Sequence, residues 1–138
     1  MNAARLPVTY KGRSLGILIL TVAQLLIGVV HVISGLLLLA AEIPFMEATI
    51  IYDVYTLVFG LLVLVFAVFI WQSKKEGWIG TVAVSTFVIA ADSLAVLNLP
   101  SIPGIPVFAA YAEIAYSLLV VSYLALDHVR VKFFPKTL

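Results

Sequence analysis

Four ionisable side chains interrupt long apolar stretches of this sequence, and each occurs in a different stretch. They are His31, Asp53, Asp92 and Glu113. An imidazole together with three carboxyls can exchange protons, hold a cation or form a hydrogen-bond network. Carboxylates in an apolar medium are costly unless they are paired, protonated or hydrated. The placement of these four groups is therefore the most informative feature for function.

The stretches that carry these residues are long enough to cross a lipid bilayer. They cover about residues 15–41, 48–71, 78–97 and 107–126. Each reaches the ~20 residues that a helix needs to cross a ~30 Å hydrocarbon layer. None alternates polar and apolar residues as a membrane strand does. Because a helix satisfies its own backbone hydrogen bonds in lipid, the sequence predicts an all-α membrane protein in which residues 1–138 form a single membrane domain.

The composition excludes most soluble classes of protein. Hydrophobic residues make up 64% of the 138 residues and charged residues 11%, whereas soluble domains have about 45–50% and about 25%. The net charge of +1 provides no basic field for phosphates, so no nucleic-acid partner is expected. The absence of cysteine removes disulfides, thiolate ligands and cysteine nucleophiles. The lipid bilayer is the expected environment.

The basic residues predict an orientation, because all eight fall on one side of a four-span arrangement. They are Arg5, Lys11, Arg13, Lys74, Lys75, Arg130, Lys132 and Lys136. The two loops on the other side contain no basic residue and carry Glu42 and Glu47. The positive-inside rule then places both termini and the middle loop in the cytoplasm. Since short loops join neighbouring helices in opposite directions, we predict an antiparallel four-helix bundle in the cell membrane.

The four ionisable groups are expected to converge. Counted from the outer ends of the spans at ~1.5 Å per residue, they lie at similar depths of roughly 8–15 Å, in the outer half of the membrane. Helical periodicity places each on a face with other polar or small residues. We therefore predict a polar upper core formed by His31, Asp53, Asp92 and Glu113. The expected supporting polar residues are Gln24, Tyr52, Tyr55 and Tyr116.

The first span also carries small residues at heptad spacing, at Thr21, Gly28 and Gly35. Small residues at this spacing let helix backbones approach closely in a bilayer. We predict that these three residues form a helix-packing seam. We also expect the chain to associate with itself or with a membrane partner protein.

The sequence leaves the role of the polar cluster open. A bound cation is one possibility, because His with carboxylates suits zinc, manganese or iron, and the metal candidates are then His31, Asp53, Asp92 and Glu113. Protonated acids in a network with the tyrosines and Gln24 are a second, serving as a proton path or only structurally. A cavity open to the outside, in which water keeps the acids charged, is a third. Asp53 and Asp92 would also be ordinary solvated residues if they simply reach the outer interface.

Several specific sites are disfavoured, and no cofactor is identified. A haem held by two histidines is disfavoured because His31 and His128 lie roughly 20 Å apart along the membrane normal. No span contains a lysine for a retinal Schiff base, and no phosphate-binding loop or nucleophile elbow is present. The favoured hypothesis is a non-enzymatic subunit or oligomeric module whose cluster handles protons or a cation. The alternative is a small metal-dependent membrane enzyme that uses the same cluster.

Short motifs occur at the start, middle and end of the chain. Arg13-Ser14-Leu15-Gly16-Ile17 opens the first span, and Gly77-Trp78 follows the basic middle loop. The tail runs from Tyr123 through Val129-Arg130-Val131-Lys132-Phe133. Together these motifs resemble a broad group of small prokaryotic four-span membrane proteins that have no known activity. The resemblance covers most of the chain and implies the four-span fold, but no activity and no functional residue.

Overall fold

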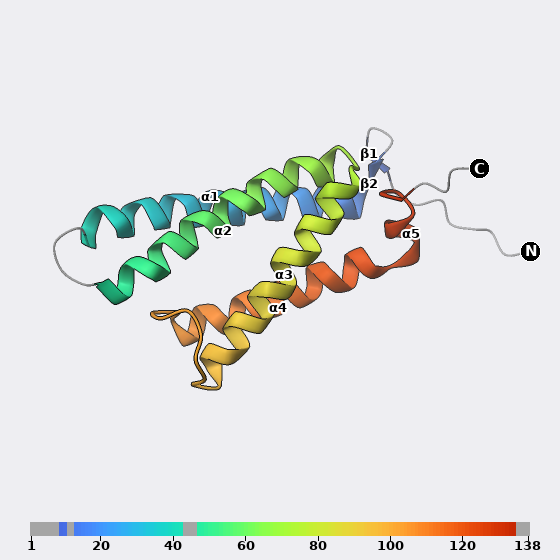
Figure 1. Cartoon of the computed structure of the whole chain (residues 1–138). Coiled ribbons are helices and arrows are strands. Elements are labelled where there is room, and N and C mark those ends of the chain that lie inside the picture. Colours follow the sequence, from blue (N-terminus) through green and yellow to red (C-terminus); the bar gives the residue numbers. More distant parts are fainter. Residues whose placement is uncertain (1–8, 11–12, 43–46, 135–138) are drawn as a thin grey trace, which may run out of the picture.

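A computed structural model of the chain describes residues 9–10, 13–42 and 47–134. Within these residues the long elements are the helices α1 (Leu15–Glu42), α2 (Glu47–Trp71), α3 (Lys75–Val96) and α4 (Val107–Ala125). The short helix α5 (Asp127–Arg130) follows α4, and the two-residue strands β1 (Thr9–Tyr10) and β2 (Arg13–Ser14) pair ahead of α1. The fold is therefore essentially all-helical (Figure 1).

In the described part of the chain, four helices are long and apolar enough to cross a membrane. The candidate spans are Leu15–Ala41, Ile50–Trp71, Lys75–Val96 and Val107–Ala125. The prediction of four helical spans is confirmed at this level. The third helix begins at Lys75, earlier than the sequence indicated, and Glu76 lies in its first turn. An acidic residue there is favourable because it faces the positive end of the helix dipole.

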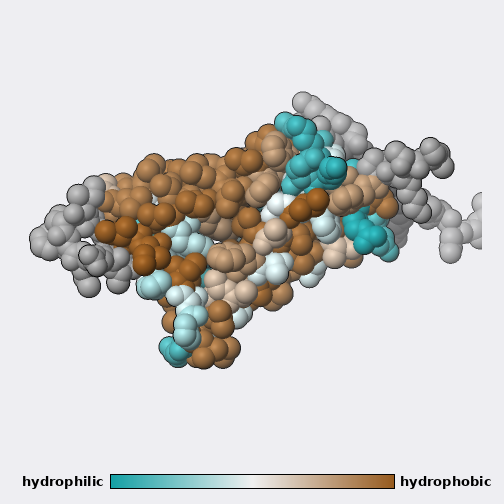
Figure 2. All heavy atoms as spheres, in the orientation of Figure 1, coloured by the Kyte–Doolittle hydropathy of each residue, from teal (hydrophilic) through white to brown (hydrophobic). Residues whose placement is uncertain are grey.

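The helices are arranged as two pairs. α1 and α2 lie side by side, as do α3 and α4, and the two pairs diverge toward one end (Figure 1). They come together at the other end, which also carries β1, β2 and α5. We call these the open end and the closed end. Large apolar side chains cover most of the visible surface, while paler, more polar residues lie in the notch between the pairs (Figure 2).

Apolar packing is concentrated at the closed end. The buried cluster there draws residues from the start of α1, the end of α2, the end of α4 and the α5 region. Its members are Ile17, Leu20, Ile70, Val120, Leu124, Val129 and Phe133. The Nε1 of Trp78, at the start of α3, donates a hydrogen bond of 2.9 Å to the Leu124 carbonyl oxygen. This end is thus tied together by contacts from all four long helices.

Glycines bring the backbones of α1 and α2 into close contact. A Cβ added to Gly60 would lie 2.8 Å from the Val32 backbone nitrogen, and one added to Gly35 would lie 2.8 Å from that of Leu57. Close contact of this kind supports helix association in lipid, where the hydrophobic effect between helices is absent. Gly28 and Gly35 of the predicted seam thus face α2 of the same chain.

Thr21, the third residue of the predicted seam, behaves differently. It is 5% exposed, and its hydroxyl donates a hydrogen bond of 2.8 Å to the Ile17 carbonyl oxygen within α1. Its polar group is therefore satisfied by its own helix, as is common for threonine in apolar surroundings.

Candidate functional site

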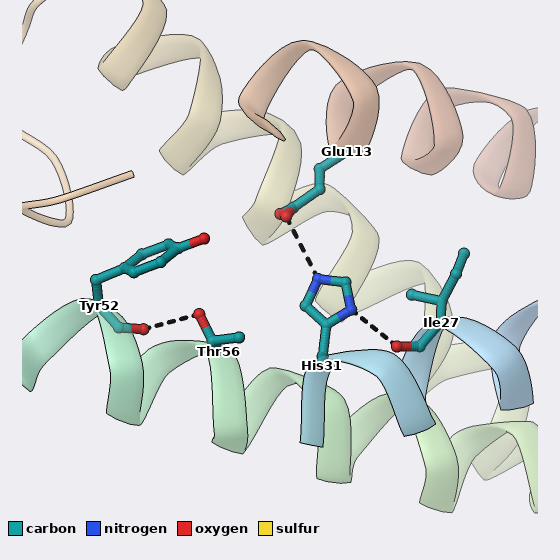
Figure 3. A network of polar contacts seen from close by, with 5 residues as sticks. All are labelled: Ile27, His31, Tyr52, Thr56 and Glu113. Atoms are coloured by element: carbon teal, nitrogen blue, oxygen red, sulfur yellow. Dashed lines mark hydrogen bonds and ion pairs between the residues drawn. The ribbon is translucent and has the colours of Figure 1, made fainter. Parts of the chain in front are cut away.

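His31 of α1 and Glu113 of α4 meet across the space between the two helix pairs (Figure 3). His31 Nε2 lies 3.4 Å from Glu113 Oε1, which is long for a hydrogen bond. The two side chains are 20% and 19% exposed. The Phe59 ring packs against the imidazole in a T-shaped arrangement, with 4.9 Å between ring centroids. The structure thus joins two of the four predicted cluster residues directly.

A hydrogen bond within α1 decides which nitrogen of His31 carries a proton. Nδ1 lies 2.8 Å from the carbonyl oxygen of Ile27. A carbonyl oxygen only accepts, so Nδ1 must carry a hydrogen and donate it. Nε2 then either accepts a hydrogen bond from the protonated Glu113 carboxyl or carries a proton and donates a hydrogen bond to the Glu113 carboxylate. In both arrangements one proton lies between the two side chains, and the pair is neutral overall.

Asp92 of α3 lies beside this pair. It is 0% exposed and interacts electrostatically with Glu113. Among the described residues, neither of its carboxyl oxygens has a hydrogen bond of regular geometry. The approach of Asp92 to Glu113 is therefore close but loosely aligned. A lone buried carboxylate is costly, so the nearby Glu113 bears on whether Asp92 carries a charge.

The remaining acid, Asp53 of α2, is 1% exposed. It shares a neighbour with the other two acids, since Tyr52 interacts electrostatically with Asp53, Asp92 and Glu113. Figure 3 shows the Tyr52 ring pointing into the space that Glu113 and His31 face. Tyr55 interacts electrostatically with Asp92 and Glu113. The structure thus brings His31 and Asp92 to Glu113, whereas Asp53 is connected to these residues through its sequence neighbour Tyr52.

A cleft of about 470 Å³ opens beside the His31–Glu113 pair. This is within the range of about 300–1,000 Å³ that small-molecule sites occupy. Its walls come from α1, α2 and α4. The polar and aromatic residues among them are His31, Ser34, Tyr52, Thr56, Phe59, Glu113 and Tyr116. The rest of the wall is aliphatic, so the cleft combines an ionisable end with an apolar body.

Gln24 belongs to a separate polar site, because it precedes His31 in α1 by about two helical turns and lies nearer the closed end. Its Nε2 donates a hydrogen bond of 3.2 Å to Thr81 Oγ1 of α3. A small cavity of about 10 Å³ is lined in part by Gln24, Thr81, Tyr116 and Ser117, which is about the volume that one water needs. Tyr116 borders both this cavity and the larger cleft. Of the expected supporting residues, Tyr52, Tyr55 and Tyr116 adjoin the acids, whereas Gln24 is occupied elsewhere.

Phe59 is a site residue that the sequence analysis missed. It packs on His31 and lines the cleft. Phe59 lies seven residues after Tyr52, and this spacing indicates that both side chains lie on the same side of α2. In a span as rich in phenylalanine as α2, that signal is weak, because aromatic residues in apolar helices usually pack or face lipid.

The geometry does not favour a metal centre. Within the described part of the chain, no three His, Cys, Asp or Glu side chains come close enough to hold one ion together. The alternative of a metal-dependent enzyme therefore gains no support from the positions of His31, Asp53, Asp92 and Glu113. The close pair and its buried acidic neighbour suit proton exchange, which needs two groups in contact and not a coordination shell.

Comparison with known proteins provides no relative for this chain. No protein-family model, no curated protein and no solved structure matches it. The similarity to small four-span proteins therefore rests on its three short motifs. The class is defined by the fold, which fits a multi-pass membrane protein with four apolar helices.

Proposed function

We propose that this chain is a multi-pass membrane protein whose intramembrane cluster takes up and releases a proton at the His31–Glu113 pair. The observation that carries the proposal is the 3.4 Å approach of His31 Nε2 to Glu113 Oε1, with the fully buried Asp92 beside Glu113. The chain acts as a non-enzymatic module, as a subunit or an oligomer, and the cluster is the site of proton exchange.

The His31 and Glu113 side chains share one proton. The His31–Glu113 pair is neutral with one proton between Nε2 and the carboxyl, and it becomes an anion when that proton leaves. Two carboxylates close together in a low-dielectric medium repel each other, so Asp92 and Glu113 do not ionise independently. A change in the protonation of one group therefore alters the proton affinity of the others.

Access to the cluster is one-sided. The cleft at the His31–Glu113 pair is open, whereas the apolar cluster around Ile17, Ile70 and Leu124 fills the closed end. An apolar layer opposes the passage of a charge. The proton therefore enters and leaves through the cleft, which is the behaviour of a sensor or binding module and not of a conductor.

In the membrane, neighbouring helices run antiparallel and both termini face the cytoplasm. The support for this orientation is the placement of the basic residues at the closed end. Lys74 and Lys75 lie where α2 gives way to α3, and Arg130 and Lys132 follow α4. The open end and its cleft then lie in the outer half of the bilayer.

Infrared difference spectroscopy of purified protein between acidic and neutral pH tests the proposal. We expect bands of protonated carboxyl groups that move in Glu113→Gln, because the remaining acids lose a coupled neighbour. The matched control is Glu76→Gln, which removes an exposed acid at the start of α3 and should leave the bands unchanged. Bands at ordinary carboxylate positions that Glu113→Gln does not alter would mean that the acids face water separately, and the proposal would fail.

A further inference from the structure

We infer that the cleft beside His31 and Glu113 binds an amphiphilic organic cation, a positively charged group on an apolar body, in exchange for the proton of the pair. This inference rests on the proposed function and names the ligand class of the same site. It is carried by the charge, the aromatic walls, the size and the access route of the cleft.

The charge around the cleft favours a cation. Glu113 lines it, Asp92 is in electrostatic contact with Glu113, and Asp53 lies beside the lining residue Tyr52. His31 is the balancing base, and its imidazole is neutral when Nδ1 carries the only ring proton and Nε2 accepts a hydrogen bond. Among the described residues after α1 begins, the lysines and arginines lie between α2 and α3, at the first residue of α3, or after α4, and none lines the cleft. Once the pair loses its proton, the site is anionic and lacks a nearby basic side chain to neutralise it.

The walls of the cleft suit the body of such a ligand. Three aromatic rings line it, from Tyr52, Phe59 and Tyr116. The faces of aromatic rings attract organic cations, and this attraction grows as water is excluded. Aliphatic side chains such as Ile27 and Val30 complete the wall. An inorganic cation would gain nothing from the aliphatic part of this wall, and the metal-binding geometry is also lacking among the described residues.

The cleft is reached from the side of the molecule. Its walls belong to α1, α2 and α4, and the lining residue Val30 is 59% exposed on a surface rich in apolar side chains. In a bilayer that surface faces lipid, so a ligand that partitions into the membrane reaches the cleft directly. The volume of about 470 Å³ accommodates a small organic molecule but not a peptide helix.

Binding and protonation compete at this site. The incoming cation pairs with the Glu113 carboxylate, the proton shared with His31 leaves through the cleft, and the charge of the site is conserved. The titratable groups near Glu113 are His31 from α1, Tyr52 and Tyr55 from α2, Asp92 from α3 and Tyr116 from α4 itself, and Asp53 lies next to Tyr52 in α2. Acidic pH should therefore weaken binding.

Isothermal titration calorimetry of detergent-solubilised protein with tetraphenylphosphonium tests the inference. We expect saturable binding that weakens at acidic pH. Titrations in two buffers of different ionisation enthalpy should report the release of about one proton for each probe bound, as linkage requires. Both measurements use the unaltered chain, so they do not depend on the folding of a variant.

The variants then locate the site. Glu113→Gln should weaken binding by about tenfold or more, equivalent to at least ~1.4 kcal/mol, while Glu76→Gln should bind like the unaltered protein. Circular dichroism confirms that each variant is folded. Tetraphenylsilane, a neutral molecule of the same shape, should not compete for the site.

Binding of tetraphenylphosphonium that does not weaken at acidic pH would overturn the inference. So would a Glu113→Gln variant that binds the probe as tightly as the unaltered protein. Coupled infrared bands without probe binding would overturn the inference alone and leave the proposed proton exchange standing.

Discussion

The hydrogen bond from His31 Nδ1 to the Ile27 carbonyl gives the imidazole a defined role. It directs Nε2 toward Glu113 and leaves that nitrogen as the one position where a proton is gained or lost. Asp92 and Gln24 are buried to a similar degree, at 0% and 3% exposure. Asp92 has no regular hydrogen bond from the described residues, whereas the amide nitrogen of Gln24 is satisfied by Thr81. Equally buried polar groups thus differ in how far they are hydrogen-bonded, since the Gln24 amide nitrogen has a partner while its Oε1 and both Asp92 oxygens have none among the described residues.

The Gln24–Thr81 hydrogen bond should contribute measurably to stability. Thr81→Val leaves the buried Gln24 amide without its partner, at a cost of about 1–3 kcal/mol in the free energy of unfolding. In a Gln24→Leu background the same substitution should cost far less, because no amide remains to be satisfied. Thermal or chemical denaturation of the four proteins gives this coupling energy. Equal costs of Thr81→Val in both backgrounds would show that the hydrogen bond contributes nothing.

The indole of Trp78 should stabilise the closed end. Trp78→Phe keeps most of the aromatic packing against Phe134, whose ring centroid lies 5.3 Å away, but removes the donor to the Leu124 carbonyl. We expect a loss of about 0.5–1.5 kcal/mol in the free energy of unfolding, the usual net contribution of such a hydrogen bond. Denaturation followed by circular dichroism measures it. A variant as stable as the parent chain would show that water satisfies the carbonyl equally well.

Pairs of helices are the next level of organisation, and each pair is held differently. α1 and α2 meet through glycines, so their backbones are close. α3 and α4 are joined by the Pro-containing link from Leu97 to Pro106, and Ser101 Oγ fixes this link to α3 through a hydrogen bond of 2.6 Å to the Ala91 carbonyl oxygen. The two pairs also approach closely near the closed end, where a Cβ added to Gly77 of α3 would lie 2.5 Å from the Ile70 backbone nitrogen of α2. The cleft lies farther toward the open end, beside His31 and Glu113.

Gly28→Leu should disturb the α1–α2 pair. A Cβ at this position would lie 2.7 Å from the Leu64 side chain and 3.1 Å from the Gly60 carbonyl oxygen. Overpacking of this kind costs about 1–3 kcal/mol. The matched control is Ala40→Leu, since Ala40 is an exposed residue of the same helix. We expect Gly28→Leu to lower the melting temperature and Ala40→Leu to leave it near that of the parent. Identical melting curves for both variants would show that the helices can separate without cost.

At the scale of the whole molecule, the closed end and the open end have different roles. The apolar cluster and the Trp78 hydrogen bond hold the closed end together. The open end carries the His31–Glu113 contact and the cleft. Because the pairs diverge there (Figure 1), small movements of one pair against the other change the distance between His31 and Glu113. Proton uptake is therefore expected to be linked to the separation of the pairs.

The proposed orientation predicts which loops an impermeant reagent reaches. The natural chain has no cysteine, so single substitutions report cleanly. In intact cells, Leu99→Cys at the open end should react with a membrane-impermeant maleimide, whereas Lys75→Cys at the closed end should react only after permeabilisation. Both positions are exposed in the fold. The reverse pattern would place the termini outside and the cleft in the inner half of the bilayer.

The sequence by itself determined the helices of this protein. Apolar stretches of ~20 residues have few stable alternatives to helix in lipid. The glycines at positions 28 and 35 indicate a face for close helix packing, and in the structure this face contacts α2. Rise per residue also predicts that the four ionisable groups lie at similar depth, and this stays a prediction. These conclusions needed only local properties of the chain.

Only the tertiary structure decided which polar groups meet. It joined His31 to Glu113, put Asp92 beside them and gave Gln24 to Thr81 instead. The sequence could not choose among these pairings, because helices that are apolar on nearly every side have little amphipathic signal to fix their rotation. The divergence of the two pairs is likewise a property of packing between distant segments. It creates the cleft, and no local pattern in the chain encodes it.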